Sequence, residues 1–178
     1  MKFIVEDGTG LPLANAFIPV SFVDEYAEEM GKADVWGVAF DSEGLPLPAD
    51  QLEKRKQQAI IQASRWISGN FVWKGTPCSP SQGLAFPRDA ITEGAIRQFP
   101  FVVREATASA AIRVFSGVIL NKDSARGGAI KRVKAGPVEV EYADNAPTDT
   151  IYTEIENMLR DLALGLGGTE FITTAVRI

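Results

Sequence analysis

The sequence contains no histidine and a single cysteine, Cys78, among its 178 residues. Histidine is the usual side chain for proton transfer near neutral pH and the commonest metal ligand. Without it, and with only one thiol, one chain cannot build a zinc site of the Cys/His type or an internal disulfide. A thiol that no histidine activates is a poor nucleophile, so we expect Cys78 to be buried or incidental.

Long apolar runs are also missing, and none reaches the roughly 18–20 residues that a membrane helix needs. The N-terminus turns acidic at Glu6 and Asp7, too early for the apolar stretch of a signal peptide. We therefore expect no membrane partner and a reducing, cytosol-like compartment.

Recognisable catalytic motifs are absent as well: there is no phosphate-binding loop, nucleophile elbow or dinucleotide fingerprint. Glu25, Glu28 and Glu29 share one short predicted helix, but nothing supplies the further ligands of a metal site. A solvated acidic face is favoured over a metal-dependent enzyme built on carboxylates. We expect a protein that is not an enzyme and that needs no cofactor or metal.

Charge is segregated along the chain, although the net charge is only −5. Residues 1–50 carry ten acidic and two basic side chains, residues 51–134 carry five and fourteen, and residues 135–178 carry eight and two. Either these charges pair within the monomer, or the acidic and basic regions of neighbouring copies meet head to tail in a ring. The negative total argues mildly against a dedicated nucleic-acid binder.

Hydrophobic periodicity and capping residues predict helices near 22–30, 51–68, 100–116 and 151–163. Ser21 with Asp24, and Asp50 with Glu53, form capping-box patterns before the first two helices. Pro100 suits the first turn of the third helix, whose alanines would let a neighbouring helix approach closely. One side of the 51–68 helix carries polar and basic side chains: Lys54, Arg55, Gln58, Gln62 and Arg65.

The predicted fold is mainly α: a small helical bundle with a short β element, a projecting loop and a C-terminal β-prone arm. The basic loop spans about 118–136, and the alternation at 138–142 predicts a strand with one wet face. Residues 1–168 would form the helical domain. The arm, residues 169–178, follows several glycines and could add to another sheet or subunit. A strand folded back onto its own domain fits the same pattern equally well.

Two sets of residues are candidates for intermolecular contact. The loop and the arm would dock on a neighbouring subunit or a partner protein, through Lys122, Arg126, Lys131, Arg132, Lys134, Phe171, Ile172, Val176 and Ile178. For DNA, Trp73 and Lys74 place an aromatic ring beside a charge, as in a stacking platform. The competing interpretation of Trp73, close to prolines, is a core side chain beneath a loop.

A resemblance to a known family rests on several segments taken together, which are Ile4–Gly10 with Ala14–Ala16, Ala63–Ile67 with Trp73–Gly75, Ser81–Arg88, and Lys134–Tyr142. In this order they resemble a phage family described as DnaT-like single-stranded-DNA-binding proteins, and they span most of the chain. Phe86 stands where the family pattern more often has tryptophan, and residues 34–48 look like an insertion.

Proteins of this kind are also similar to the helical head–tail connectors of tailed phages, which form a ring, commonly twelvefold, beneath the portal. That likeness implies a structural adaptor in the neck of the virion, assembled in the host cytoplasm. Its partners would be further copies of itself, the portal protein, a stopper or tail protein, and DNA in transit.

We expect the adaptor function, because acidic chain ends suit a channel that repels phosphate and lets DNA pass. The alternative is a single-stranded-DNA-binding replication protein. Its contacts would be Trp73, Lys74, Lys131, Arg132 and Lys134.

Overall fold

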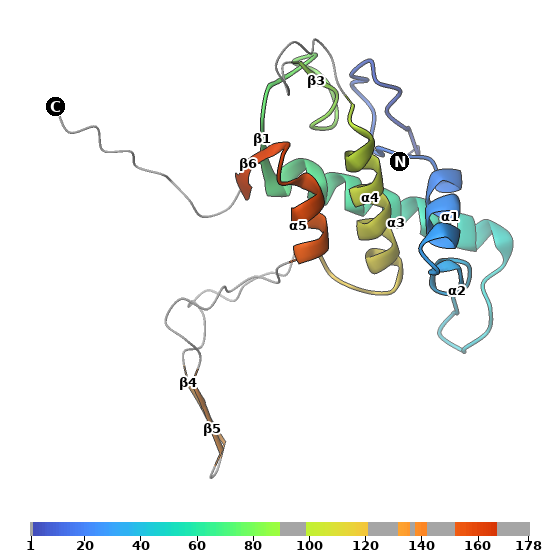
Figure 1. Cartoon of the computed structure of the whole chain (residues 1–178). Helices are drawn as coiled ribbons and strands as arrows, with labels where there is room; N and C mark the ends of the chain where they lie inside the picture. The colour runs from blue at the N-terminus through green and yellow to red at the C-terminus, as the bar shows by residue number, and fades with distance from the viewer. Residues whose placement is uncertain (1, 90–98, 121–131, 136–137, 142–151, 167–178) are drawn as a thin grey trace.

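The computed structural model describes residues 2–89, 99–120, 132–135, 138–141 and 152–166. The helices are α1 (Val20–Glu29), α2 (Ala33–Trp36), α3 (Ala49–Asn70), α4 (Phe101–Phe115) and α5 (Thr153–Leu159). The strands are β1 (Phe71–Trp73), β2 (Thr76–Pro77), β3 (Arg88–Asp89), β4 (Arg132–Ala135), β5 (Val138–Glu141) and β6 (Ala163–Leu166). The fold is mainly α with short sheets, as predicted (Figure 1). Among the described helices, none is both long and apolar enough to cross a bilayer.

Helix α4 is the centre of the fold. It crosses α3 and has α1 and α5 beside it (Figure 1). A helix that is apolar nearly all round is expected to be buried on all sides. Most residues of α4 are buried. Its fully buried side chains are mainly small, and they are Val103, Ala106, Thr107, Ala108, Ala110 and Ala111. Small side chains let α1, α3 and α5 pack closely against α4.

The three longer helices begin at prolines and not at the predicted capping boxes. Pro19, Pro48 and Pro100 are the N-cap residues of α1, α3 and α4, and none of these caps uses a side-chain hydrogen bond. Proline keeps the residue before it out of the helical region, so no helix begins earlier. Each of these prolines is itself extended, with ψ between 140° and 165°, and the helix begins at the next residue. The prediction that Ser21 and Asp50 cap the first two helices was wrong, because each lies inside the first turn.

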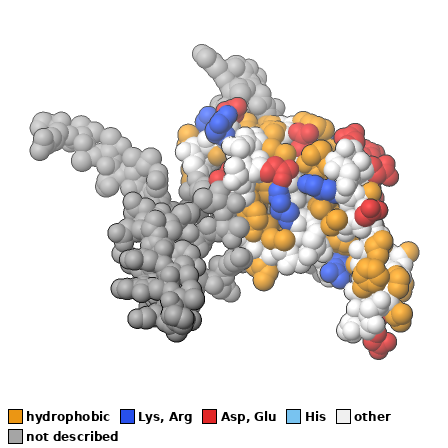
Figure 2. Space-filling model, turned by 60° about the horizontal axis from the view of Figure 1, so that its bottom comes forward, with side chains coloured by type: hydrophobic (Ala, Val, Ile, Leu, Met, Phe, Trp, Pro, Cys, Tyr) orange, Lys and Arg blue, Asp and Glu red, His pale blue; other side chains and the backbone are white. Residues whose placement is uncertain are grey.

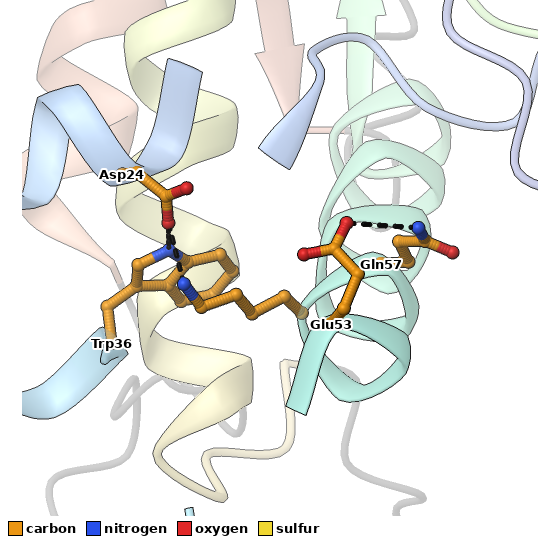
Figure 3. Close-up of polar contacts among 5 residues, drawn as sticks. Asp24, Trp36, Glu53 and Gln57 are labelled. Carbon is orange, nitrogen blue, oxygen red and sulfur yellow. Dashed lines mark hydrogen bonds and ion pairs between the residues drawn. The ribbon is translucent and has the colours of Figure 1, made fainter. Parts of the chain in front are cut away.

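Asp24, expected in a cap, instead joins three helices. Its carboxylate accepts hydrogen bonds from the Trp36 indole Nε1 and from the Lys56 ammonium, each at 2.7 Å (Figure 3). Lys56 lies 5.3 Å from the centre of the Trp36 ring, which in turn packs on Phe115 of α4. One carboxylate on α1 therefore fixes α2 and α3 against the central helix.

The N-terminal segment is held by a buried carboxylate. Glu6 is only 4% exposed and accepts hydrogen bonds from the backbone N–H groups of Gly8, Gly10 and Leu11 at 2.8–3.0 Å. Leu11 then accepts a hydrogen bond from the Gly83 backbone N–H at 3.0 Å. This docks the first residues of the chain on the segment before β3.

The last described strand was not predicted. β6 pairs antiparallel with β1, with Phe71 opposite Leu166 and Trp73 opposite Ala163. The fourth predicted helix, 151–163, is correspondingly shorter, because α5 ends at Leu159 and the chain turns back as a strand. The predicted arm, residues 169–178, lies outside the described residues.

The remaining short strands form two more antiparallel pairs. β2 pairs with β3, and β4 pairs with β5. β5 confirms the strand predicted from alternation at 138–142, while β4 adds a strand inside the predicted basic loop.

Replacing Asp24 with alanine removes the shared acceptor of Trp36 and Lys56. We expect the free energy of unfolding to fall by about 1–3 kcal/mol, because partly buried donors lose their partner. Urea unfolding followed by circular dichroism measures this change. Glu25→Ala, an exposed neighbour on the same helix, should change stability by less than about 0.5 kcal/mol. Equal effects of the two substitutions would contradict the role given to Asp24.

A second pair of variants tests how the N-terminal segment docks. A Cβ at position 83 would lie 2.4 Å from the Ala14 carbonyl oxygen, whereas a Cβ at Gly69 meets nothing within 4 Å. We expect Gly83→Ala to destabilise the protein by about 1–3 kcal/mol through this overlap. Gly69→Ala, in the last turn of α3, should be neutral or stabilising. Thermal unfolding of both variants measures the difference.

Candidate nucleic-acid interface

One side of α3 presents five exposed side chains that are all basic or amide: Lys54, Arg55, Gln58, Gln62 and Arg65, named here the basic α3 face. The helix turns its other side inward, where Ile60, Trp66 and Ile67 are buried. Lys54 and Arg65 are eleven residues apart, so the face runs for about 16 Å at 1.5 Å per residue. The sequence has no acidic residue from 54 to 70, and so α3 itself supplies no carboxylate to this face.

The acid nearest in sequence is already engaged. Glu53 accepts a hydrogen bond from Gln57 at 3.1 Å, one turn further along the helix (Figure 3). Lys, Arg and Gln side chains are the donors that proteins use for phosphate oxygens. The basic α3 face is therefore suited to a phosphate backbone.

A groove adjoins the face where the chain leaves α4. It has a volume of about 490 Å³ and lies between the second half of α3 and residues 117–120, with Gln62 and Arg65 on one wall and Val118 and Ile119 on the other. Gly117 has a φ of +91°, a conformation that glycine adopts without strain, and the chain turns there. Ile119 is 65% exposed, so the groove combines donors with an accessible apolar wall.

Several other basic side chains serve the fold. Lys56 binds Asp24, and Arg113 of α4 binds Glu154 of α5. Arg88 donates to three backbone carbonyls, those of Lys74, Gly75 and Ala85, and burial lowers its pKa from the ordinary value. Figure 2 shows Lys and Arg side chains lying among hydrophobic ones, with several acidic side chains at the right-hand edge and others scattered over the face.

Trp73 does not present a stacking face. Its side chain is 7% exposed, packs edge-on to Phe86 at 4.8 Å between ring centres, and donates to the Ser68 carbonyl. The ammonium of Lys74 donates to the backbone carbonyl of Asp161 at 2.8 Å. The prediction that Trp73 offers a surface for base stacking is therefore corrected: it is a core side chain, and Lys74 helps to hold β1 near the end of α5.

The other predicted contact residues fall in or beside undescribed parts of the chain. The residues outside the described ranges are Lys122, Arg126, Lys131, Phe171, Ile172, Val176 and Ile178. Arg132 and Lys134 are in β4, where the register places Glu141 and Glu139 opposite them. The β4–β5 strands therefore carry as many acidic as basic residues.

The basic α3 face and the groove were not predicted as a site. The helical period did place these five side chains on the solvent side, and the acid-free run from 54 to 70 was visible in the sequence. The groove depends on residues 117–120, which reach α3 only through the packing of α4, and no local pattern marks them. Within the described residues no three acidic or cysteine side chains gather as a metal site would require.

The fold and this surface define a mainly α protein with a basic, acid-free helix face. The sequence matches, over residues 1–178, the family described as "Putative DnaT-like ssDNA binding protein", and the chain belongs to that family. A comparison with curated proteins gave no match, and neither did a comparison with solved structures.

The family corrects the predicted function. We expected a phage neck adaptor beneath the portal, with single-stranded-DNA binding as the alternative, and the family's description fits the alternative. The adaptor prediction rested on a likeness to phage head–tail connectors, together with charge summed over long stretches of sequence. Such sums do not locate charges on the surface, where the structure places Lys54, Arg55 and Arg65 exposed along one side of α3.

The three tryptophans allow the burial of Trp73 to be tested. Trp36, Trp66 and Trp73 are 1%, 5% and 7% exposed. We expect iodide, which quenches only accessible indoles, to quench the native fluorescence several-fold less than that of the protein unfolded in urea. Strong quenching of the native protein would show that an indole is accessible, and would reinstate Trp73 as a stacking candidate.

Proposed function

We propose that the protein binds single-stranded DNA through the basic α3 face and the adjoining groove. The observation that carries this proposal is an exposed, acid-free helix face with three basic side chains beside an open groove, in a chain of this family. Phosphate neutralisation by Lys and Arg supplies most of the affinity of such interfaces.

The groove supports a single strand as the ligand. Val118 and Ile119 are 40% and 65% exposed on its apolar wall. Apolar side chains can contact base faces when the bases are unpaired and turned toward the protein, whereas in a duplex those faces are stacked. No aromatic side chain is exposed among the described residues that line the groove, so binding should show little sequence preference.

The sequence after the groove adds further charge. From Leu120, which lines the groove, the chain continues into residues 121–134, which contain five basic residues and one acid. The chain that follows the groove in sequence is therefore also basic, which is the composition expected of a segment that contacts phosphates.

The basic α3 face can be tested through the salt dependence of binding. For single strands, log K falls with log salt by about 0.7 for each phosphate contact. We expect the double variant Arg55→Gln, Arg65→Gln to weaken binding of a labelled oligothymidine and to reduce this slope by about 1.4. Fluorescence anisotropy between low and moderate salt measures both effects.

Lys2→Gln is the control, because Lys2 is exposed on the N-terminal segment and away from α3 in sequence. It should leave the slope unchanged. A wild-type protein that binds neither oligothymidine nor duplex DNA at low salt would overturn the proposal. Tighter binding of duplex than of single strands would overturn the part that assigns bases to the groove.

A further inference from the structure

The loop between α2 and α3 is an ordered projection that we name the acidic tip (residues 38–46). Phe40 and Pro46 form a β-bridge across it, and the Asp41 N–H donates to the Leu45 carbonyl at 2.9 Å. The Asp41 carboxylate accepts hydrogen bonds from the N–H groups of Glu43 and Leu45, both at 2.9 Å. The loop therefore has a set shape, which reduces the entropy lost when it binds a partner.

The acidic tip exposes apolar side chains that nothing in the fold covers. Val38, Phe40 and Leu45 are 46%, 56% and 57% exposed. Glu43, whose carboxylate is not part of the Asp41 turn, is exposed beside them. A contiguous exposed apolar patch with a charged rim is a feature of interaction surfaces. The tip lies at the lower right of Figure 1, beyond α2.

The groove beside the basic α3 face is complementary to this tip. It offers an apolar wall, Val118 and Ile119, facing Gln62 and Arg65. An apolar, acidic projection and an apolar, basic groove are complementary in charge sign and in apolar surface, and such complementarity selects partners. We propose that the acidic tip of one copy of this chain docks in the groove of a second copy.

A chain cannot fill its own groove in this way. The tip leads into the start of α3 at Ala49, whereas Gln62 is thirteen residues further along the same helix, about 20 Å away. The end of α4 lies between them, where Phe115 packs on Trp36 of α2. The contact is therefore between molecules and head to tail, so each docked copy leaves one tip and one groove available for another.

Docking and DNA binding would compete for the same groove, and this consequence rests on the function proposed above. Glu43 would occupy the place of a phosphate near Arg65, so single-stranded DNA should disperse associated copies. Moderate salt should disperse them too, because the attraction between exposed charges is screened.

The test is sedimentation velocity of the full chain at low salt, without DNA. We expect the wild type to associate, and we expect Glu43→Lys or Arg65→Glu alone to weaken association roughly tenfold or more through like-charge contact. An equimolar mixture of E43K and R65E should associate again, because the unaltered tip of R65E fits the unaltered groove of E43K, and the charge-reversed tip of E43K fits the charge-reversed groove of R65E. Glu25→Lys, an exposed charge reversal on α1, is the matched control and should sediment as the wild type.

A wild type that stays monomeric at low salt overturns the docking proposal, and so does a mixture that fails to associate. Neither result depends on DNA, so failure of docking is distinguishable from failure of DNA binding. In anisotropy titrations at concentrations where copies associate, E43K should bind oligothymidine more tightly than the wild type. Association without any DNA binding would retain the docking and remove the proposed function.

Discussion

One carboxylate, that of Asp24, links three of the helices that pack around α4. It accepts hydrogen bonds from Trp36 and Lys56, and thereby ties α1 to α2 and α3, while Trp36 carries the link to Phe115 of α4. The inward position of Lys56 agrees with the rotation of α3 that its buried side chains, among them Ile60 and Ile67, already require. That rotation turns Lys54, Arg55 and Arg65 to solvent and the apolar stripe of α3 toward α4. The exposure of the basic α3 face therefore follows from the packing of the core.

The residues that carry the family resemblance mostly build the scaffold. Glu6 binds three backbone N–H groups, Asn15 bridges Lys2 and Ile4, and Arg88 binds three carbonyls. Gly83 has no room for a side chain beside the Ala14 carbonyl. Family motifs of this kind specify how the N-terminal segment and the segment before β3 fit together. The proposed DNA surface is marked instead by the absence of acids on one side of a helix.

The distribution of charged residues along the sequence was the observation that misled the prediction of function. The central part of the sequence has a large excess of basic residues, but these side chains have different roles once the chain is folded. Lys56, Arg88 and Arg113 bind groups of the protein and are partly buried or bound at several atoms, whereas the side chains of the basic α3 face are exposed beside a groove, with the Arg55 guanidinium 5.4 Å from the centre of the Phe115 ring. The acidic residues of the first fifty likewise include Asp24 and Glu6, which are structural, and Glu43 of the acidic tip, which is exposed. A tally by sequence region combines these roles and therefore cannot assign a function.

The sequence by itself determined the mainly α class, the positions of four helices to within a few residues, and the solvent side of α3, because the helical period is a local property. It also determined β5, through alternation. Only the tertiary structure decided the pairing of β1 with β6, the burial of Trp73 and the wall of the groove. Phe71 and Leu166 are far apart in the chain, and Val118 meets the neighbourhood of Arg65 only after α4 packs on α3. Contacts between residues so far apart in the sequence depend on how whole helices and strands pack, and no short stretch of residues encodes them.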